Sequence, residues 1–176
     1  MSNTIPDNFE PTSGNSNYLR LTPGKHRVRI LADAIAGYEY WEDTTDGGRK
    51  PIRSKLDAPV PVEQAENVKK FLAFTVWSYE AERVQIMEIG QASIQRELKA
   101  LEKDKEWGDL QTFDIEIERT GTDKMSTRYR VSPKPQSELN EDVIKAVEAG
   151  LPNLQALFKS EDPFATQNVD EKDLPF

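Results

Sequence analysis

Hydrophobic and polar residues alternate along five stretches of the chain, and this two-residue period predicts β-strands. The first predicted strand is long and bends near the turn at residues 22–24. In the second, Trp77 and Tyr79 lie opposite a more hydrophobic face formed by Leu72, Phe74 and Val76. The predicted strands cover residues 18–41, 71–79, 83–89, 112–119 and 124–132.

Hydrophobic residues at helical spacing predict an amphipathic helix over residues 92–104. A second helix is predicted over residues 141–149, with Asn140 as its N-cap and Gly150 at its end. Pro152 opens a further short turn. Residues 42–60, which are rich in Gly and Pro, predict a long loop, and a short helix is expected to begin at Pro61.

The order of these elements is strand, loop, strand, strand, helix, strand, strand. It predicts a mostly β protein with the OB-fold, a five-stranded Greek-key barrel whose helix lies between strands three and four. We expect four segments. They are a flexible N-terminal arm (1–17), an OB-fold domain (18–137), a helical C-terminal extension (138–158) and a disordered acidic tail (159–176).

Charge is distributed unevenly along the chain. The formal net charge of the 176 residues is −8, and residues 138–176 hold nine acids but three bases. Three windows elsewhere contain bases and no acids, at residues 18–31, 49–55 and 124–134. Two of them fall on or beside the loops with which OB-folds hold oligonucleotides. This asymmetry predicts a basic body joined to an acidic tail.

The absence of cysteine excludes disulfides, thiolate metal sites and cysteine nucleophiles, and His26 is the single histidine. No hydrophobic stretch approaches the roughly 20 residues that span a bilayer. The polar residues 1–17 do not resemble a signal peptide. We therefore expect a cytoplasmic protein that holds no cofactor or metal and does not contact a membrane.

The combination of basic windows and aromatic residues predicts binding of single-stranded nucleic acid. Such a ligand presents phosphates and unstacked bases, so a protein that binds it independently of sequence needs cations and aromatic rings. The residues expected to contact it are Arg27, Arg29, Tyr38, Tyr40, Trp41, Arg49, Lys50, Arg53, Lys55, Trp77, Tyr79, Arg128 and Arg130.

Two alternative functions use the acidic residues instead. Asp114, Glu116 and Glu118 alternate along one predicted strand and offer carboxylate oxygens to a divalent metal, as in a metal-dependent nucleic-acid enzyme. Alternatively, the net charge of −8 is compatible with a DNA mimic that binds proteins and ignores oligonucleotides.

The last seven residues, "DEKDLPF", resemble the acidic C-terminal tip of bacterial single-stranded-DNA-binding proteins. Residues 70–139 separately resemble the OB-fold single-stranded-DNA-binding proteins of tailed bacteriophages, through "KKFLAFTVWSYEAERVQIMEI", "SIQRELKALEKDKEWGDLQTFDIEIERTG" and "STRYRVSPKPQSEL". Some of those relatives carry a structural zinc on Cys and His ligands, which this cysteine-free chain does not offer.

The resemblance implies a protein that is not an enzyme and that binds and protects single-stranded DNA during DNA replication, recombination or repair. It acts in the cytoplasm of a bacterial host if a bacteriophage encodes it. It also implies that the tip recruits replication and recombination proteins. A partner pocket would receive the ring and carboxylate of the last residue, while the acids steer toward its basic rim. The tip residues are Asp170, Glu171, Asp173, Leu174, Pro175 and Phe176.

Overall fold

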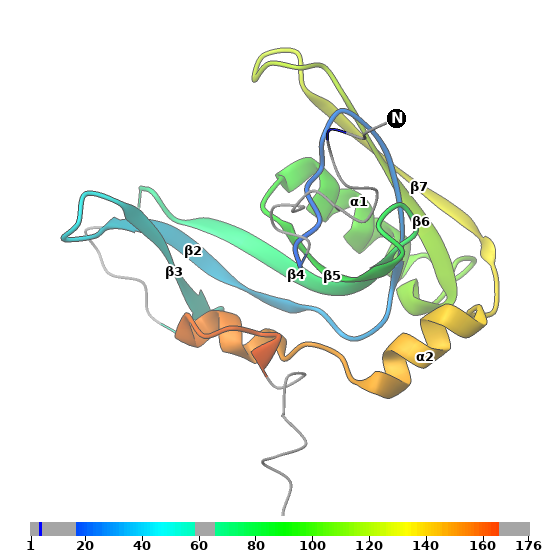
Figure 1. Cartoon of the computed structure of the whole chain (residues 1–176). Coiled ribbons are helices and arrows are strands. Elements are labelled where there is room, and N and C mark those ends of the chain that lie inside the picture. Colours follow the sequence, from blue (N-terminus) through cyan, green and yellow to red (C-terminus); the bar gives the residue numbers. More distant parts are fainter. Residues whose placement is uncertain (1–3, 5–16, 59–65, 166–176) are drawn as a thin grey trace, which may run out of the picture.

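The computed structural model describes residue 4, residues 17–58 and residues 66–165, which form one seven-stranded antiparallel sheet with two α-helices and two 3₁₀ helices (Figure 1). The strands are β1 (Gly24–Ile30), β2 (Ile35–Asp43), β3 (Arg49–Lys55), β4 (Lys69–Ser78), β5 (Arg83–Ile89), β6 (Phe113–Thr120) and β7 (Arg128–Gln136). The helices are α1 (Ala92–Lys103), α2 (Glu141–Ala149), η2 (Leu110–Thr112) and η3 (Leu154–Lys159).

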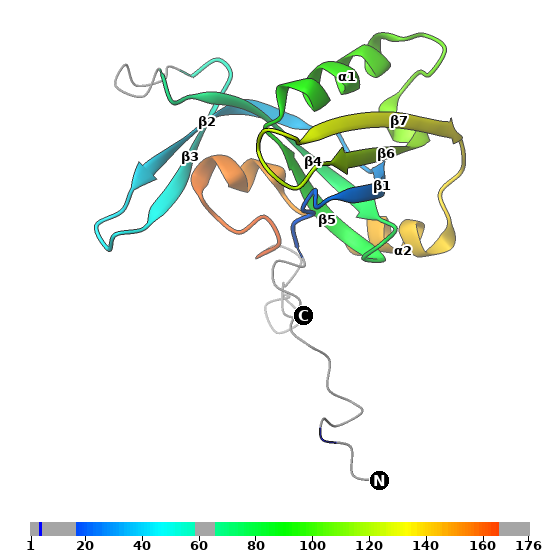
Figure 2. The same ribbon diagram turned by 90° about the horizontal axis from the view of Figure 1, so that it is seen from above.

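Strand β4 is the centre of the sheet. Strand β5 pairs with one edge of β4, while β1 and β2 share its other edge, β1 along residues 76–78 and β2 along residues 69–73. β6 and β7 then follow β1, and β3 follows β2. The sheet curves strongly, and the β2–β3 and β6–β7 hairpins project from it in different directions (Figures 1 and 2).

The inner face of the sheet, which packs against α1, carries the main hydrophobic core. The predicted alternation is confirmed in β6, where Phe113, Ile115 and Ile117 are fully buried. Helix α1 contributes Ile94 and Leu98 to the same cluster. The helical period gives α1 one hydrophobic face, and the two-residue period gives each strand another. These faces pack against each other and form the core.

The opposite, outer face carries a second hydrophobic cluster beneath the C-terminal segment. Ile35, Ala73 and Ile86 of the sheet pack there against Leu154 and Leu157 of η3. Phe164 completes this cluster, 7% exposed, with its ring edge toward Tyr18. Both faces of β4 are consequently buried, which explains why its sequence is nearly continuous in hydrophobic residues.

Most predicted elements are confirmed. Residues 71–79 and 83–89 form the expected hairpin, and the helices at 92–104 and 141–149 form as α1 and α2. The Asn140 side chain accepts a hydrogen bond from the Val143 amide at 3.0 Å, and Gly150 ends α2 with a positive φ of 112°.

The predicted strand count and helix position were wrong. The long first strand is two strands, β1 and β2, because the chain bends at residues 31–34 as it passes from one end of β4 to the other. The predicted loop contains the strand β3, which lies at the edge of the sheet. Pro51 has no N–H group to donate, and an edge strand tolerates this because no further strand pairs with its outer side. Helix α1 therefore follows the fifth strand and not the third.

The last strand lies further along the chain than predicted. The prediction was residues 124–132, whereas β7 spans Arg128–Gln136. It includes Pro133 and Pro135, which an edge strand tolerates. A register shift in the β6–β7 ladder lies at residues 113–115. Across the described residues, no hydrogen-bonded ladder joins β5 to β7, so the sheet stays open where an OB barrel would close.

The predicted boundary between the C-terminal extension and the tail was also wrong. Lys159 ends η3, and Pro163 and Phe164 are buried. The Asn153 amide donates to the Pro163 carbonyl at 2.8 Å. The chain from 159 to 165 is therefore part of the folded domain. The predicted arm at 1–16, apart from residue 4, the helix start at Pro61 and the tip at 170–176 lie outside the described residues.

Candidate nucleic-acid interface

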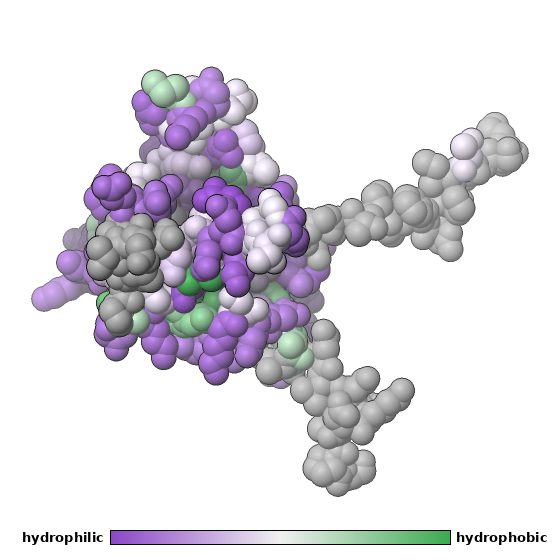
Figure 3. All heavy atoms as spheres, turned by 90° about the vertical axis from the view of Figure 1, so that its left-hand side faces the viewer, coloured by the Kyte–Doolittle hydropathy of each residue, from purple (hydrophilic) through white to green (hydrophobic). Residues whose placement is uncertain are grey.

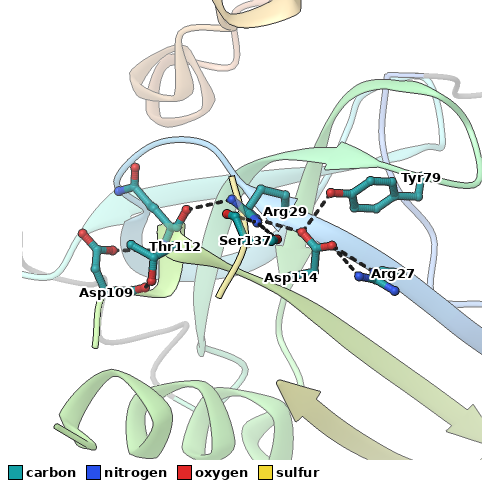
Figure 4. Close-up of polar contacts among 8 residues, drawn as sticks. Arg27, Arg29, Tyr79, Asp109, Thr112, Asp114 and Ser137 are labelled. Carbon is teal, nitrogen blue, oxygen red and sulfur yellow. Dashed lines mark hydrogen bonds and ion pairs between the residues drawn. The ribbon is translucent and has the colours of Figure 1, made fainter. Parts of the chain in front are cut away.

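A buried carboxylate lies at the centre of a hydrogen-bond network on the outer face of the sheet (Figure 4). Asp114 of β6 lies opposite Arg29 in the β1–β6 ladder and is 3% exposed. Its Oδ2 accepts from Nε and Nη2 of Arg27 at 2.9 and 2.8 Å. Its Oδ1 accepts from Nε of Arg29 at 2.8 Å and from the Tyr79 hydroxyl at 2.9 Å. Both carboxylate oxygens are thus occupied by protein donors.

Arg29 is a structural residue in this arrangement. Its side chain is 2% exposed and also donates to the carbonyl and hydroxyl oxygens of Ser137, at 2.9 and 2.7 Å. It thereby ties the segment after β7 to β1. The prediction that Arg29 contacts DNA is therefore corrected, because its guanidinium is enclosed by the network and does not reach the surface.

Arg27 and Tyr79 remain partly accessible on the outer face. The Arg27 side chain is 49% exposed, and its guanidinium carbon lies 5.5 Å from the centre of the Tyr79 ring. Because Asp114 holds the Arg27 guanidinium by two hydrogen bonds, the cation is fixed in position beside an aromatic ring. A positioned cation beside a ring is an arrangement suited to a base and its phosphate.

The Tyr79 phenol has a perturbed protonation equilibrium. Partial burial, followed by the hydrogen bond to Asp114, raises the pKa of Tyr79 from 10.0 to about 12. The folded state therefore holds this proton more tightly than the unfolded state does. The contribution to stability is complete below about pH 10 and is lost as the pH rises through about 12.

We expect the stability advantage of the wild type over Tyr79→Phe to shrink between about pH 10 and about pH 12, because the tyrosine of the unfolded chain ionises above about pH 10 while the folded state keeps its proton up to about pH 12. Urea unfolding of both proteins across this range measures it. A difference in unfolding free energy that is independent of pH would show that Asp114 does not hold the phenol proton.

Beside this network, β4, β5 and α2 enclose a groove on the outer face, which we call the outer groove. Its volume is about 920 Å³. Trp77 and Tyr79 line one side, and Lys145 of α2 lies on another, with Arg83 also in the lining. Glu82 and Asp142 are among the acids of the lining. Trp77 is only 8% exposed, so little of its ring is accessible from the groove.

The rest of the outer face consists of the charged strands β1, β6 and β7. Lys25 lies near Glu116 and Glu118 at 3.9 Å, and Lys134 lies 3.6 Å from Glu116. Basic residues outnumber acidic ones on this face, six to three. The basic residues are Lys25, Arg27, Arg29, Arg128, Arg130 and Lys134, and the acidic residues are Asp114, Glu116 and Glu118.

The β2–β3 hairpin carries seven of the predicted contacts but is electrically balanced. Arg53 is largely buried and pairs with Glu39 at 2.8 Å and Glu88 at 3.0 Å. Arg49 lies 3.5 Å from Asp43. Tyr40 is buried and Tyr38 half-buried, whereas Trp41 is 47% exposed. The exposed predicted residues of the hairpin are Trp41, Arg49, Lys50 and Lys55.

The side chains of the β2–β3 hairpin also project to different sides. Side chains alternate between the two faces of the hairpin along its strands. Trp41 lies on the same face as Arg49 and Arg53, whereas Lys50 lies on the opposite face. The Lys55 ammonium lies 6.0 Å from the centre of the Phe158 ring of η3. Trp41 is therefore the one predicted aromatic of this hairpin that presents an accessible ring.

The basic windows do not converge on one cleft as predicted. The window at 49–55 lies in the β2–β3 hairpin, and the window at 124–134 lies in the β6–β7 hairpin, which points away from it (Figure 1). Figure 3 shows the β6–β7 hairpin standing above the rest of the described surface, covered mainly by hydrophilic residues. Arg128 and Arg130 are exposed on its outer side.

The carboxylates of β6 do not form a metal site. Asp114 is enclosed by two arginines and a tyrosine, while Glu116 and Glu118 lie near lysines. Among the described residues, no group of three or more His, Asp or Glu is arranged to hold a metal ion. The geometry therefore does not support the metal-dependent alternative.

Sequence reasoning missed Lys145 and Arg83 in the outer groove. Lys145 stands in an acidic segment, and nothing in its local pattern indicates that α2 lies beside β4 and β5.

A second cavity, of about 580 Å³, lies between α1, β2 and β4, and none of the predicted contact residues line it. Its lining includes Leu72, Leu98 and Lys70.

No protein-family model, curated protein or solved structure matches the chain. No helix in the described part of the chain is long and hydrophobic enough to cross a membrane.

Proposed function

We propose that the protein binds single-stranded DNA, largely independently of sequence, along the outer face from the outer groove across β1, β6 and β7. The observation that carries the proposal is the proximity of Arg27, which lies 5.5 Å from the Tyr79 ring, to Trp77 and Tyr79 in the lining of the outer groove. These residues come from two separate predicted strands. Three features of a strand path thus adjoin: aromatic side chains, a fixed arginine and a face with excess positive charge.

Unpaired cations extend this path. Among described residues, Arg130 and Lys145 form no ion pair, and both are exposed. Neutralising backbone phosphates with such cations releases counterions, which supplies most sequence-independent affinity. The excess of basic residues on this face also favours DNA binding over the DNA-mimic alternative, which requires a predominantly acidic surface.

The proposal includes an OB-fold architecture for the body. When β1 and β2 are counted as one bent strand and β3 is set aside as an insertion, the order becomes strand, strand, strand, helix, strand, strand, as the OB-fold requires. Two features depart from it. The β3 strand is additional, and the outer face of β4 and β5 is largely covered by η3. The available path is therefore shifted toward β1, β6 and β7.

The test is titration of a fluorescently labelled oligo-dT with the full chain and with the double variant Arg130→Gln/Lys145→Gln. We expect tight binding at low salt by the wild type and weaker binding by the variant. The slope of log affinity against log salt should fall by about 0.7 for each phosphate that the variant no longer neutralises.

The matched control is Lys103→Gln/Lys105→Gln, which removes the same charge from exposed positions at the end of α1. Its salt slope should equal that of the wild type. Absence of wild-type binding at low salt would disprove the proposed function. Equal losses of affinity in both double variants would disprove the proposed path, because net charge alone would then explain the affinity.

We further propose that the acidic residues near the C-terminus compete with DNA for the basic face and that Leu174, Pro175 and Phe176 recruit partner proteins. The support is the charge asymmetry of the chain, since nine acids lie within residues 138–176. The resemblance of "DEKDLPF" to the tip of bacterial single-stranded-DNA-binding proteins supports the second role.

A further inference from the structure

The tip of the β6–β7 hairpin, residues 119–129, forms a further concave surface that was not among the predicted contacts. The β6–β7 register places Arg119 directly opposite Tyr129. Together with Lys124 and Thr127, these two residues line a hollow of about 450 Å³. We propose that this hollow is a phosphate-binding site, formed by Arg119, Lys124 and Tyr129. In its application to DNA, the inference rests on the proposed function.

The hollow has an uncompensated positive charge. Arg119 and Lys124 form no ion pair with any described residue. The one acid within the connecting turn is Asp123, whose carboxylate accepts the Ser126 amide at 2.7 Å. That bond and the Ser126 side chain lower the pKa of Asp123, so Asp123 is an ionised carboxylate that is hydrogen-bonded to Ser126. Asp123 is not among the residues that line the hollow. An oxyanion would therefore meet two cations without a competing partner.

Arg119 is already held in place on one side. Its Nη1 donates to the Leu21 carbonyl at 2.9 Å, which anchors the guanidinium against the segment before β1. Its Nε is buried and has no hydrogen-bond partner in the described structure. A buried N–H without an acceptor is unfavourable, so the Arg119 guanidinium keeps donor capacity that its contact with the protein does not use.

The turn that carries Lys124 has a defined shape. Gly121 has a φ of +85°, and a Cβ atom there would overlap the Ser126 carbonyl oxygen. The Thr127 amide donates to the Asp123 carbonyl at 3.0 Å, which closes the turn. Because the Thr127 hydroxyl also donates to Asp123, we assign no donor role to Thr127. The tyrosine hydroxyl of Tyr129 completes the donor set.

The ligand chemistry is a tetrahedral phosphate, which arginine recognises with its planar fork and lysine with a point charge. The phosphate source favoured by the structure is a nucleic-acid backbone, because the same hairpin carries Arg128 and Arg130 on its opposite, outer face, which adds positive charge around the hollow. Free inorganic phosphate is the second source, and the experiment separates the two.

Two titrations of the full chain test the site. In the first, inorganic phosphate is added to isotope-labelled protein while the backbone resonances of residues 119–129 are followed. In the second, labelled oligo-dT is titrated at several salt concentrations with the wild type, Lys124→Gln, Lys124→Gln/Tyr129→Phe and the control Lys103→Gln. Lys124 is an exposed turn residue, so its replacement leaves the fold intact.

We expect saturable phosphate shifts at residues 119–129 and a salt slope about 0.7 smaller in Lys124→Gln than in the wild type, with Lys103→Gln unchanged. Tyr129→Phe should weaken binding further. Phosphate shifts without any oligonucleotide binding would support the site with free phosphate as its ligand and disprove the proposed function. Oligonucleotide binding that is insensitive to Lys124→Gln, together with no phosphate shifts, would overturn the inference.

Discussion

Replacing Asp114 with alanine is expected to lower the free energy of unfolding by about 3–5 kcal/mol, the usual loss when one partner of a buried ion pair is removed. The carboxylate accepts four hydrogen bonds, from Arg27, Arg29 and Tyr79. Its removal would leave the Arg29 guanidinium, which is 2% exposed, as a buried charge without a counterion. Urea denaturation followed by circular dichroism measures this loss.

The matched control for Asp114 is Glu116→Ala, two residues along the same strand and on the same face. Glu116 pairs with Lys25 and Lys134 at 3.9 and 3.6 Å near the surface, and such pairs contribute about 0–1 kcal/mol. If the two variants lost similar stability, Asp114 would be no more than another surface carboxylate. The network would then not be the structural support of the outer face.

Replacing Phe164 with alanine is expected to cost about 3–5 kcal/mol, as for other buried phenylalanines. Its ring is 7% exposed, contributes to the cluster beneath η3 and lies 6.4 Å from the ring of Tyr18. The substitution would uncover the outer face of β4 and β5, which the C-terminal segment protects. Thermal and urea unfolding of the variant measure the effect.

Truncation supplies the control for Phe164. A chain that ends at Ala165 keeps the ring and should match the full chain in stability, whereas a chain that ends at Ser160 should lose at least as much as Phe164→Ala. Equal stability of the two truncated chains would contradict the structural role of Phe164.

The chain that ends at Ala165 also tests whether the acidic tail competes with DNA, because it removes the tail and keeps the Phe164 ring. We expect this truncated chain to bind oligo-dT more tightly than the full chain.

The candidate site was predictable only where local pattern determines side-chain direction. Trp77 and Tyr79 were expected on the face opposite the hydrophobic core, and the structure places both in the lining of one groove. Lys145 was not predictable, since its position beside β4 depends on where the chain returns after β7. The β6–β7 hollow was missed for a similar reason: Arg119 and Tyr129 become neighbours only through the strand register.

By itself, the sequence determined the elements whose signals are local. The two-residue period specified the core faces of β1, β4 and β6, and the helical period with its caps specified α1 and α2, because side-chain direction follows backbone geometry over a few residues. Only the tertiary structure decided which charges are free. Arg29 meets its carboxylate 85 residues away, and the basic windows of two hairpins point in different directions (Figure 1). Pairing between distant strands sets such contacts, and no local pattern encodes it.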